Sequence, residues 1–480
     1  MSEFYINWHQ FISFSAWFFW GYFVAINSCY LILNLISFFN LKGYMPNKVL
    51  ESLPQIYSGL EPPVSILIPA YNEQTTIVAS IQSMLQLTYP LFELIVVNDG
   101  SKDETLEVLK KNFGLLPFPE AYRERLKTKA VRGIYQSTRH PNLRVIDKEN
   151  GGKSDALNAA INASRYPLFC SVDADSFLQR NSLQRITYPF MEDHRVVAVG
   201  GTVRVANGCT VKDGFLKEVR VPGNLLALFQ VVEYLRAFLF GRLGWSVMGG
   251  LLIISGAFGL FRKDTVLDVG GFSTDTVGED MELVVRMHRL LRKQKKAYRM
   301  VFLADPVSWT EAPENFKTLR IQRIRWQLGL CESLFGNLGL LFNRNGGVPG
   351  WLAFPFMLIF ECLGPMVEVA GYILMVIFYW LDFISWPMFL VFLFAAIGMG
   401  MLLSLSSLLL EEMSFHLYNH NRPWQIPVLL FAAILENLGY RQLNSVWRLM
   451  GLFRWMLYEN HRWGEMQRKG SWHKQQAVKK

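Results

Sequence analysis

The stretch LFCSVDAD, residues 168–175, runs from a short apolar segment directly into two carboxylates that stand one residue apart. Its first five residues predict a buried strand, because they are apolar or small and include aromatic and β-branched side chains. A carboxylate pair at a strand end can hold a divalent ion, since Mg²⁺ and Mn²⁺ prefer oxygen ligands and leave positions open for substrate phosphates. Such pairs also occur by chance in turns, so the interpretation depends on the surrounding sequence.

From residue 64 to about residue 166, short β-rich runs alternate with helical runs. The predicted strands cover residues 65–69, 93–97, 143–146 and 168–172, and the predicted helices cover residues 75–86, 102–112 and 153–164. This alternation predicts an α/β domain with a mostly parallel sheet wrapped by helices, and such sheets bind ligands at the carboxyl ends of their strands. Residues 114–140 interrupt the pattern with charge and proline, and we interpret them as a surface excursion.

Two long segments, Phe4–Leu41 and Phe383–Leu410, contain no Asp, Glu, Lys or Arg. A membrane-spanning helix needs about 20 such residues. The first segment is too long for a signal peptide and no basic residue precedes its apolar run, so it predicts a retained anchor. The net charge of +9 fits a membrane protein with a basic cytoplasmic face better than a nucleic-acid-binding protein. The five cysteines form no CxxC pair, which argues against a zinc site.

These features divide the chain into six predicted regions. They are an anchor (1–41), a linker (42–62), a cytoplasmic catalytic domain (63–319), an amphipathic interfacial helix (320–350), transmembrane or interfacial helices (351–460) and a basic cytoplasmic tail (461–480). The apolar stretch Trp351–Leu381 carries Glu361 and Glu368, and intramembrane carboxylates usually face a bundle interior. They favour a polar path through the membrane, with helix packing as the alternative.

Three further motifs contain candidate site residues. Asp99, in NDGS, suits either a hydrogen bond to a nucleotide base or an Asx turn. Lys153, in GGKS at a predicted helix start, suits either a diphosphate, together with backbone N–H groups, or a solvated surface position. Glu279 and Asp280 precede an apolar-periodic helix; Asp280 can act as a general base, but acids also favour helix starts for the dipole alone.

The motif QRIRW, residues 322–326, places Gln322, Arg325 and Trp326 at i, i+3 and i+4, so they share one helix face. Arg325 could neutralise a departing diphosphate. Trp326 could stack on the apolar face of a sugar, with Gln322 hydrogen bonding beside it. A helix at the membrane surface also favours Arg and Trp, which is the alternative explanation.

Together, these motifs resemble those of processive family 2 glycosyltransferases, the group that includes bacterial poly-N-acetylglucosamine, hyaluronan, chitin and cellulose synthases. The resemblance runs from about Pro63 to Gly329. The matching motifs are IPAYNE (68–73), NDGS (98–101), GKSDALN (152–158), DAD (173–175), SGAFG (255–259), GED (278–280) and QRIRW (322–326). One departure is Gly278, which stands where the family usually has Thr before Glu-Asp.

The resemblance implies a GT-A fold and inverting transfer from a UDP-sugar with Mg²⁺ or Mn²⁺ as cofactor. It assigns catalytic roles to Asp280, Glu279 and Asp173, with Asp280 as the base, and metal binding to Asp175. It assigns substrate binding to Tyr71, Asp99, Lys153, Asp173, Ser255, Gly256, Ala257, Gln322, Arg323, Arg325 and Trp326.

The sequence therefore predicts a multi-pass enzyme of the bacterial inner membrane that extends a β-linked polysaccharide and helps to translocate it. UDP-N-acetylglucosamine is the expected donor, because the motif spellings are closest to poly-N-acetylglucosamine and chitin-type synthases. The expected partners are the donor, the growing glycan and the bilayer, with export proteins or a second copy as further candidates and no nucleic acid. The alternatives are a non-processive transferase that adds one sugar to a lipid carrier, and a catalytically inactive envelope scaffold.

Overall fold

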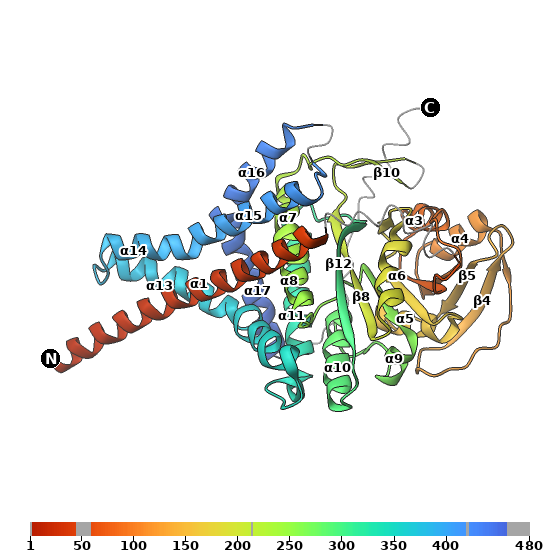
Figure 1. Ribbon diagram of the computed structural model, residues 1–480, viewed down its shortest axis with the longest axis horizontal. Coiled ribbons are helices and arrows are strands. Elements are labelled where there is room, and N and C mark those ends of the chain that lie inside the picture. The colour runs from red at the N-terminus through yellow and green to blue at the C-terminus, as the bar shows by residue number, and fades with distance from the viewer. Residues whose placement is uncertain (1, 45–58, 213–214, 419–421, 458–480) are drawn as a thin grey trace.

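The computed structural model describes residues 2–44, 59–212, 215–418 and 422–457. Most of the predicted linker, and the whole of the predicted basic tail, lie outside these residues. An α/β domain packs beside a group of apolar helices that project from it, including the long helix α1, Ser2–Tyr44 (Figure 1).

A ten-stranded sheet forms the centre of the α/β domain, in the order β3-β4-β5-β2-β1-β6-β11-β8-β12-β7. Its strands are β1 (Val64–Ala70), β2 (Phe92–Asp99), β3 (Leu115–Pro117), β4 (Val131–Ser137), β5 (Leu143–Lys148), β6 (Leu168–Val172), β7 (Phe177–Leu178), β8 (Val196–Val205), β11 (Phe258–Arg262) and β12 (Arg299–Thr310). The neighbours β5, β2, β1 and β6 pair in parallel, as β8 does with β12. The other pairs are antiparallel, and a separate hairpin joins β9 (Thr210–Lys212) to β10 (Phe215–Glu218).

The predicted α/β sheet is confirmed, and each of the four predicted strands is present to within two residues at either end. The parallel pairs β5–β2–β1–β6 form the centre, where strands buried on both faces read as continuous apolar runs. The prediction of a surface excursion at 114–140 is wrong in part, because β3 and β4 extend the sheet there. Strand β4 was hard to predict from the sequence, because most of its side chains are half-exposed and it contains Gly133. Its strand structure is evident from its pairing with β5.

Helices cover both faces of the sheet. They are α3 (Ile77–Leu85), α4 (Thr105–Phe113), α5 (Lys153–Ala163), α6 (Ser182–Glu192), α7 (Leu225–Glu233), α8 (Arg242–Val247), α9 (Lys263–Asp268) and α10 (Glu279–Lys293). Successive residues of β1 point to opposite faces, so Ile66 and Ile68 pack with α3, α4 and α6, whereas Leu67 packs with α5 and α10. Because β5, β2, β1 and β6 are parallel, their carboxyl ends lie at one edge of the sheet.

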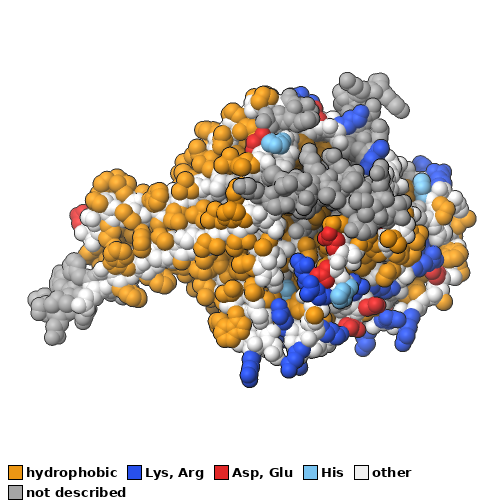
Figure 2. Space-filling model, in the orientation of Figure 1, with side chains coloured by type: hydrophobic (Ala, Val, Ile, Leu, Met, Phe, Trp, Pro, Cys, Tyr) orange, Lys and Arg blue, Asp and Glu red, His pale blue; other side chains and the backbone are white. Residues whose placement is uncertain are grey.

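Among the described residues, two helical segments are long and apolar enough to cross a membrane, Ile12–Leu41 and Trp386–Ser414. A third candidate is the pair Pro349–Cys362 and Gly364–Trp380, which is bent by 43°. The first span lies within α1, and the other segments contain α12 (Phe354–Phe356), α13 (Gly364–Trp380), α14 (Trp386–Leu393) and α15 (Met399–Ser414). Hydrophobic side chains cover the projecting helices, whereas charged side chains gather on the α/β domain (Figure 2). The chain is therefore that of a membrane protein.

Helix α11, Phe316–Phe335, carries the QRIRW motif and lies between the two parts of the molecule. It packs against α10 on one side and against α17, Arg441–Met456, on the other. Helix α16, Gln425–Leu435, leads into α17 through a break at Leu438 and Gly439, whose backbone is not helical. Helix α11 is thus partly buried between α10 and α17, and its position at the membrane surface stays a prediction.

A buried ion pair fastens the sheet to the membrane helices. Arg204 on β8 lies 2.6 Å from Glu411 on α15, and both side chains are no more than 2% exposed. Removing one partner of such a pair leaves an uncompensated buried charge, which costs about 3–5 kcal/mol, whereas replacing both by apolar residues is often neutral.

We expect Arg204→Met to lower the thermal unfolding temperature of the detergent-solubilised protein clearly, and Arg204→Met/Glu411→Leu to restore most of the loss. Lys110→Met, which breaks an exposed pair with Glu107 on α4, is the matched control and should change stability by less than about 1 kcal/mol. Equal unfolding temperatures for the single and double variants at 204 and 411 would contradict the assigned role.

Candidate active site

A cavity of about 480 Å³ lies between the α/β domain and the apolar helices. The end of β6, the starts of α5 and α10 and one side of α11 contribute to its wall. The predicted site residues that line it are Lys153, Asp173, Asp175, Ser255, Gly256, Ala257, Glu279, Asp280, Gln322, Arg323, Arg325 and Trp326. The structure therefore brings together motifs that are far apart in the sequence.

Lys153 joins the two acidic motifs inside this cavity. Its Nζ lies 2.8 Å from Oδ1 of Asp173 and 2.9 Å from Oε1 of Glu279. Burial opposes the charge of Lys153, but Asp173 and Glu279 outweigh it and raise the Lys153 pKa above its usual range. Burial raises the pKa of Glu279, and the ammonium of Lys153 counteracts that shift. Lys153 is thus a permanent cation beside the carboxylates.

Asp280, in the first turn of α10, has a carboxylate that is oriented by backbone N–H groups. The N–H of Gly256 donates to Oδ2 of Asp280 at 2.9 Å, and the N–H of Met281 donates to Oδ1 at 2.8 Å. A Cβ at position 256 would lie 2.9 Å from Nζ of Lys153, so a larger residue there would displace this ammonium. The half-buried carboxylate therefore has a fixed position on the cavity wall, as a general base needs.

Asp173 and Asp175 follow β6 and both line the cavity. No group of three His, Cys, Asp or Glu side chains in the described part of the chain is arranged to hold a metal ion. Mg²⁺ and its relatives are commonly bound through one or two carboxylates, with substrate phosphates completing the coordination. The two aspartates therefore fit a divalent ion that binds together with a diphosphate.

Asp99 does not line the cavity; it closes the loop before α5. Its carboxylate accepts hydrogen bonds from the N–H groups of Gly151 at 3.0 Å and Gly152 at 2.7 Å. It also pairs with the fully buried Lys148 at 2.7 Å, and Lys148 in turn pairs with Asp155 at 2.5 Å. The glycine N–H groups that the sequence suggested for a diphosphate are therefore engaged by Asp99. A nucleotide contact of Asp99 remains a prediction.

Tyr71 also lies outside the cavity lining, half-buried in the loop after β1. The next residue, Asn72, has a left-handed backbone with φ of 56°. Its N–H donates to Oγ of Ser101 at 3.1 Å, and its Oδ1 accepts from the N–H of Lys102 at 2.9 Å. These bonds tie the loops after β1 and β2 together at the carboxyl edge of the sheet.

The four candidate residues of the QRIRW motif all line the cavity, but Arg323 also anchors the helix to its neighbour. Gln322, Arg325 and Trp326 are half-buried and line the cavity, as their shared helix face predicts. Arg323 is 2% exposed and pairs with Glu233 of α7 at 2.7 Å, which favours a positioning role over substrate contact. Its guanidinium also lies over the Trp326 ring, 4.3 Å from the centroid, so that ring face is not open to a sugar.

The same cavity continues among the apolar helices, where polar side chains pair across it. Arg448 of α17 lies 2.7 Å from Glu361 and donates to Oε1 of Gln327 at 3.0 Å. Arg236 pairs with Glu436. The cavity therefore has a polar lining among the apolar helices.

The sequence indicated Glu361 as part of a polar path but missed several lining residues on the segment between β10 and β11. Glu233, Arg236 and Arg242 line the cavity. The available signal was a set of charges spaced along an otherwise apolar helical stretch, residues 225–247. That signal shows only that the charges need partners, without showing which ones.

Comparison with known proteins is consistent with this geometry. The family model described as glycosyl transferase family 2 matches residues 65–266, and the model described as glycosyl transferase family group 2 matches residues 168–399. Between residues 65 and 399, the chain therefore carries a family 2 glycosyltransferase domain. The matched regions contain all of the acidic motifs and the QRIRW helix.

Two curated relatives are poly-beta-1,6-N-acetyl-D-glucosamine synthases. The one from Staphylococcus epidermidis is 27% identical over 310 residues, which cover 64% of this chain and 63% of the relative. The one from Staphylococcus aureus strain COL is 28% identical over 274 residues, which cover 56% of this chain and 55% of the relative. The match thus spans less than two thirds of the length of either relative.

Among solved structures, the chain is similar to a mannosyltransferase from Pyrobaculum calidifontis in complex with GDP-Man and Mn²⁺. The TM-score is 0.50 and the identity 18%, and the match covers 88% of this chain and 99% of the other. At this identity the likeness concerns the fold alone. The GT-A fold implied by the sequence motifs is confirmed.

A close backbone contact fixes Glu279 and Asp280 relative to α11. A Cβ added at Gly278 would lie 2.6 Å from Cα of Gly329, and one added at Gly329 would lie 2.6 Å from Cα of Gly278. This contact explains why position 278 carries glycine where the related pattern has Thr. Neither backbone can yield without moving α10 away from the QRIRW helix.

We expect Gly278→Ala to cost about 1–3 kcal/mol of stability, the usual price of overpacking, and to lower turnover. Gly223→Ala is the matched control, because a Cβ at Gly223 has no atom within 4 Å. Thermal unfolding and nucleotide release from a sugar-nucleotide donor check both variants. Unchanged stability of Gly278→Ala would show that α10 and α11 are free to separate.

Proposed function

We propose that this protein transfers a sugar from a UDP-sugar onto a growing β-linked glycan at the cytoplasmic side of the membrane, and passes the product through its own helices. The observation that carries the proposal is the single cavity that runs from Asp280 and Lys153 to Glu361 and Arg448 among the apolar helices. In this proposal, the donor chemistry and the path of the glycan share that one cavity.

The geometry supports a direct displacement. Asp280 accepts the proton of the acceptor hydroxyl as that oxygen bonds to the anomeric carbon of the donor sugar. The bond from the anomeric carbon to the diphosphate breaks, and its electron pair leaves with UDP. Attack from the face opposite the leaving group inverts the anomeric centre, so an α-linked donor gives a β linkage.

The leaving diphosphate needs positive charge, which stabilises the transition state most where water is excluded. Lys153 and Arg325 line the cavity and supply two cations. A divalent ion, when bound, supplies further positive charge at the diphosphate. Asp173 and Asp175 are the residues that would hold it, and Glu279 keeps Lys153 in place at 2.9 Å.

The relatives support the choice of donor. Two of them are named as poly-beta-1,6-N-acetyl-D-glucosamine synthases, so UDP-N-acetylglucosamine is the donor that we propose. Selectivity would follow from a few contacts around the sugar, since small differences in a pocket decide between similar substrates. Ser255 and Ala257, which precede β11, line that part of the wall.

The arrangement of the helices supports a membrane topology. Helices α13 and α14 form a hairpin whose turn lies far from the α/β domain, toward the same end as the start of α1 (Figure 1). If α1 enters from outside, α13 leaves and α14–α15 return, both the α/β domain and α16–α17 lie in the cytoplasm. This path also places the predicted basic tail inside, in agreement with the positive-inside rule.

Two other functions are weaker. A non-processive transferase with a lipid acceptor needs no polar lining deep among the helices, whereas Glu361, Arg448 and Glu368 line the cavity here. A catalytically inactive scaffold has no need for the buried Lys153–Glu279 pair. Product length, measured by chromatography after incubation with UDP-N-acetylglucosamine, separates polymer synthesis from single addition.

We expect Asp280→Asn to reduce sugar transfer by about 10²–10⁴-fold, the usual contribution of a general base. The measurement is UDP release by the purified protein in detergent, with size-exclusion chromatography to show that the variant is folded. Asp275→Asn, five residues upstream and exposed, is the matched control and should keep wild-type turnover. Equal turnover of Asp280→Asn and wild type would refute the assignment.

We expect EDTA to abolish UDP release and added Mn²⁺ or Mg²⁺ to restore it. Asp175→Asn should raise the metal concentration for half-maximal activity by at least about tenfold, since one of only two carboxylates is lost. Full turnover in EDTA-treated protein would mean that Lys153 and Arg325 alone balance the diphosphate.

A further inference from the structure

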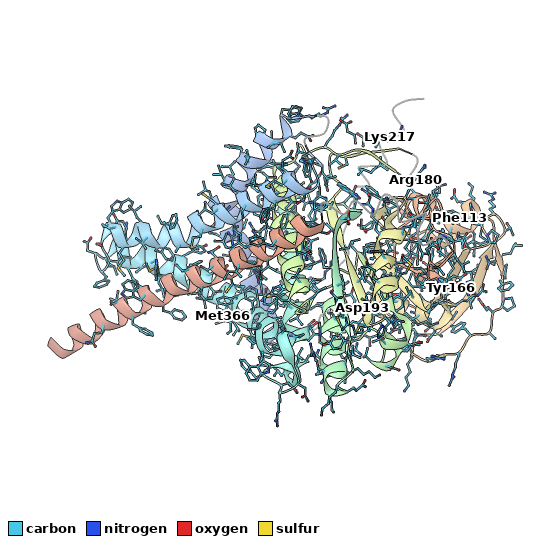
Figure 3. All side chains as sticks on the ribbon, in the orientation of Figure 1. Phe113, Tyr166, Arg180, Asp193, Lys217 and Met366 are labelled. Atoms are coloured by element: carbon cyan, nitrogen blue, oxygen red, sulfur yellow. The ribbon has the colours of Figure 1, made fainter. Side chains whose placement is uncertain are left out.

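A second cavity, of about 450 Å³, lies at the opposite edge of the α/β domain. It is an open recess lined by the loop of residues 120–125, the end of α5, the turn before β6 and the start of α9. It lies at the amino ends of β1 and β6, whereas the catalytic cavity lies at their carboxyl ends. The two cavities share no lining residue. Figure 3 shows Tyr166, which lines the second cavity, on the side of the domain away from Met366 and the projecting helices.

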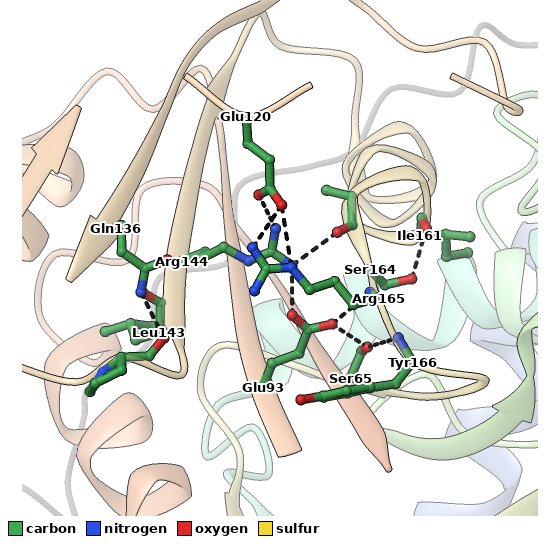
Figure 4. A network of polar contacts seen from close by, with 12 residues as sticks. Ser65, Glu93, Glu120, Gln136, Leu143, Arg144, Ile161, Ser164, Arg165 and Tyr166 are labelled. Carbon is green, nitrogen blue, oxygen red and sulfur yellow. Dashed lines mark hydrogen bonds and ion pairs between the residues drawn. The ribbon is translucent and has the colours of Figure 1, made fainter. Parts of the chain in front are cut away.

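The polar network beside this cavity is closed and electrically balanced (Figure 4). Arg144 is 2% exposed, pairs with Glu93 at 2.6 Å and pairs also with Glu120. Glu120 forms a second ion pair, with Arg165, at 2.7 Å. Glu93 also accepts hydrogen bonds from Oγ of Ser65 at 2.6 Å and from the N–H of Arg165 at 2.8 Å. Two guanidinium groups and two carboxylates therefore neutralise one another.

The cavity wall is also fixed in place. Asn162, at the end of α5 and 8% exposed, accepts hydrogen bonds from the N–H groups of Arg125 at 3.1 Å and Leu126 at 3.0 Å. Its Nδ2 donates to the carbonyl of Leu126 at 2.8 Å. The backbone that carries Arg125 is thus held against α5 without help from any ligand.

Beyond the balanced network, three cations line the cavity against one carboxylate. They are Arg123, Arg125 and Lys263, opposed by Asp264. In the described part of the chain, no carboxylate forms an ion pair with Arg123 or Arg125. Lys263 donates to the carbonyl of Ser164, and its pKa is lowered by burial and then by the charge of Arg125. The protein's own groups therefore leave positive potential uncompensated here.

We propose that this cavity is a second ligand site, which takes a small soluble phosphate-bearing anion of about nucleotide size. Its volume lies in the range of small-molecule pockets and is too small for a folded partner. Guanidinium groups bind phosphate oxygens in pairs, and the half-buried rings of Tyr122 and Tyr166 add flat surfaces for a base. A lipid headgroup does not fit a site on the far side of the domain.

Helix α5 connects this site to the catalytic cavity. Its first residue, Lys153, pairs with Asp173 and Glu279, and its last residue, Ala163, lines the second cavity about 15 Å away. Strand β11 makes the same connection, because Ala257 precedes it and Lys263 follows it. A ligand in the second cavity would therefore contact the far ends of two elements that position catalytic residues.

The test uses the full chain in detergent with EDTA, which removes the metal that a nucleotide would need in the catalytic cavity. Isothermal titration with pyrophosphate and with AMP measures binding. We expect saturable binding of one equivalent of at least one probe to the wild type, and at least tenfold weaker binding to Arg123→Gln/Arg125→Gln. Both arginines are exposed, so this variant should fold normally. Tighter binding of AMP than of pyrophosphate would assign the ligand to the nucleotides, and the reverse would assign it to simple phosphates.

Two controls separate the site from other sources of binding. Lys127→Gln/Lys129→Gln removes two charges from the same loop outside the cavity, and Arg325→Ala removes a cation from the catalytic cavity; both should bind as the wild type does. The proposal is overturned if neither probe binds saturably to the wild type. It is also overturned if the two loop double variants weaken binding equally, or if Arg325→Ala abolishes binding. None of these results depends on whether the protein transfers sugars.

Discussion

The catalytic half of this protein depends on one buried cation. Lys153 bridges Asp173, at the end of a strand, and Glu279, at the start of a helix that follows more than a hundred residues later. The buried ammonium of Lys153 keeps its charge because two carboxylates flank it. This requirement brings β6, α5 and α10 to one point, and the close contact of Gly278 with Gly329 then adds α11. The position of Asp280 follows from these contacts.

A second constraint orders the membrane half. Charged side chains among apolar helices must find partners, because no bulk water is present to solvate them. Arg323 pairs with Glu233, Arg448 pairs with Glu361, and Arg236 pairs with Glu436. Each pair joins elements that are distant in the sequence, so the pairs fix how the helices meet the catalytic domain. The continuity of the cavity is a consequence of this pairing.

The same residue types have different tasks at the two edges of the sheet. At the carboxyl edge, cations lie beside carboxylates that a metal and a diphosphate can share. At the amino edge, the network of Arg144, Glu93 and Glu120 is already neutral, so the remaining arginines are available to a ligand. The two edges of the sheet therefore differ in which charged side chains already have a partner within the protein.

The sequence by itself determined the strands of the parallel centre, the aspartates after β6 and the two long apolar spans, because these follow from local periodicity and composition. It also indicated which side chains could perform transfer chemistry. Only the tertiary structure decided that the N–H groups of Gly151 and Gly152 serve Asp99, that Arg323 covers one face of Trp326, and that residues 114–140 add strands to the sheet. Each of these contacts involves a residue from another part of the chain. Local sequence does not specify which residue that will be.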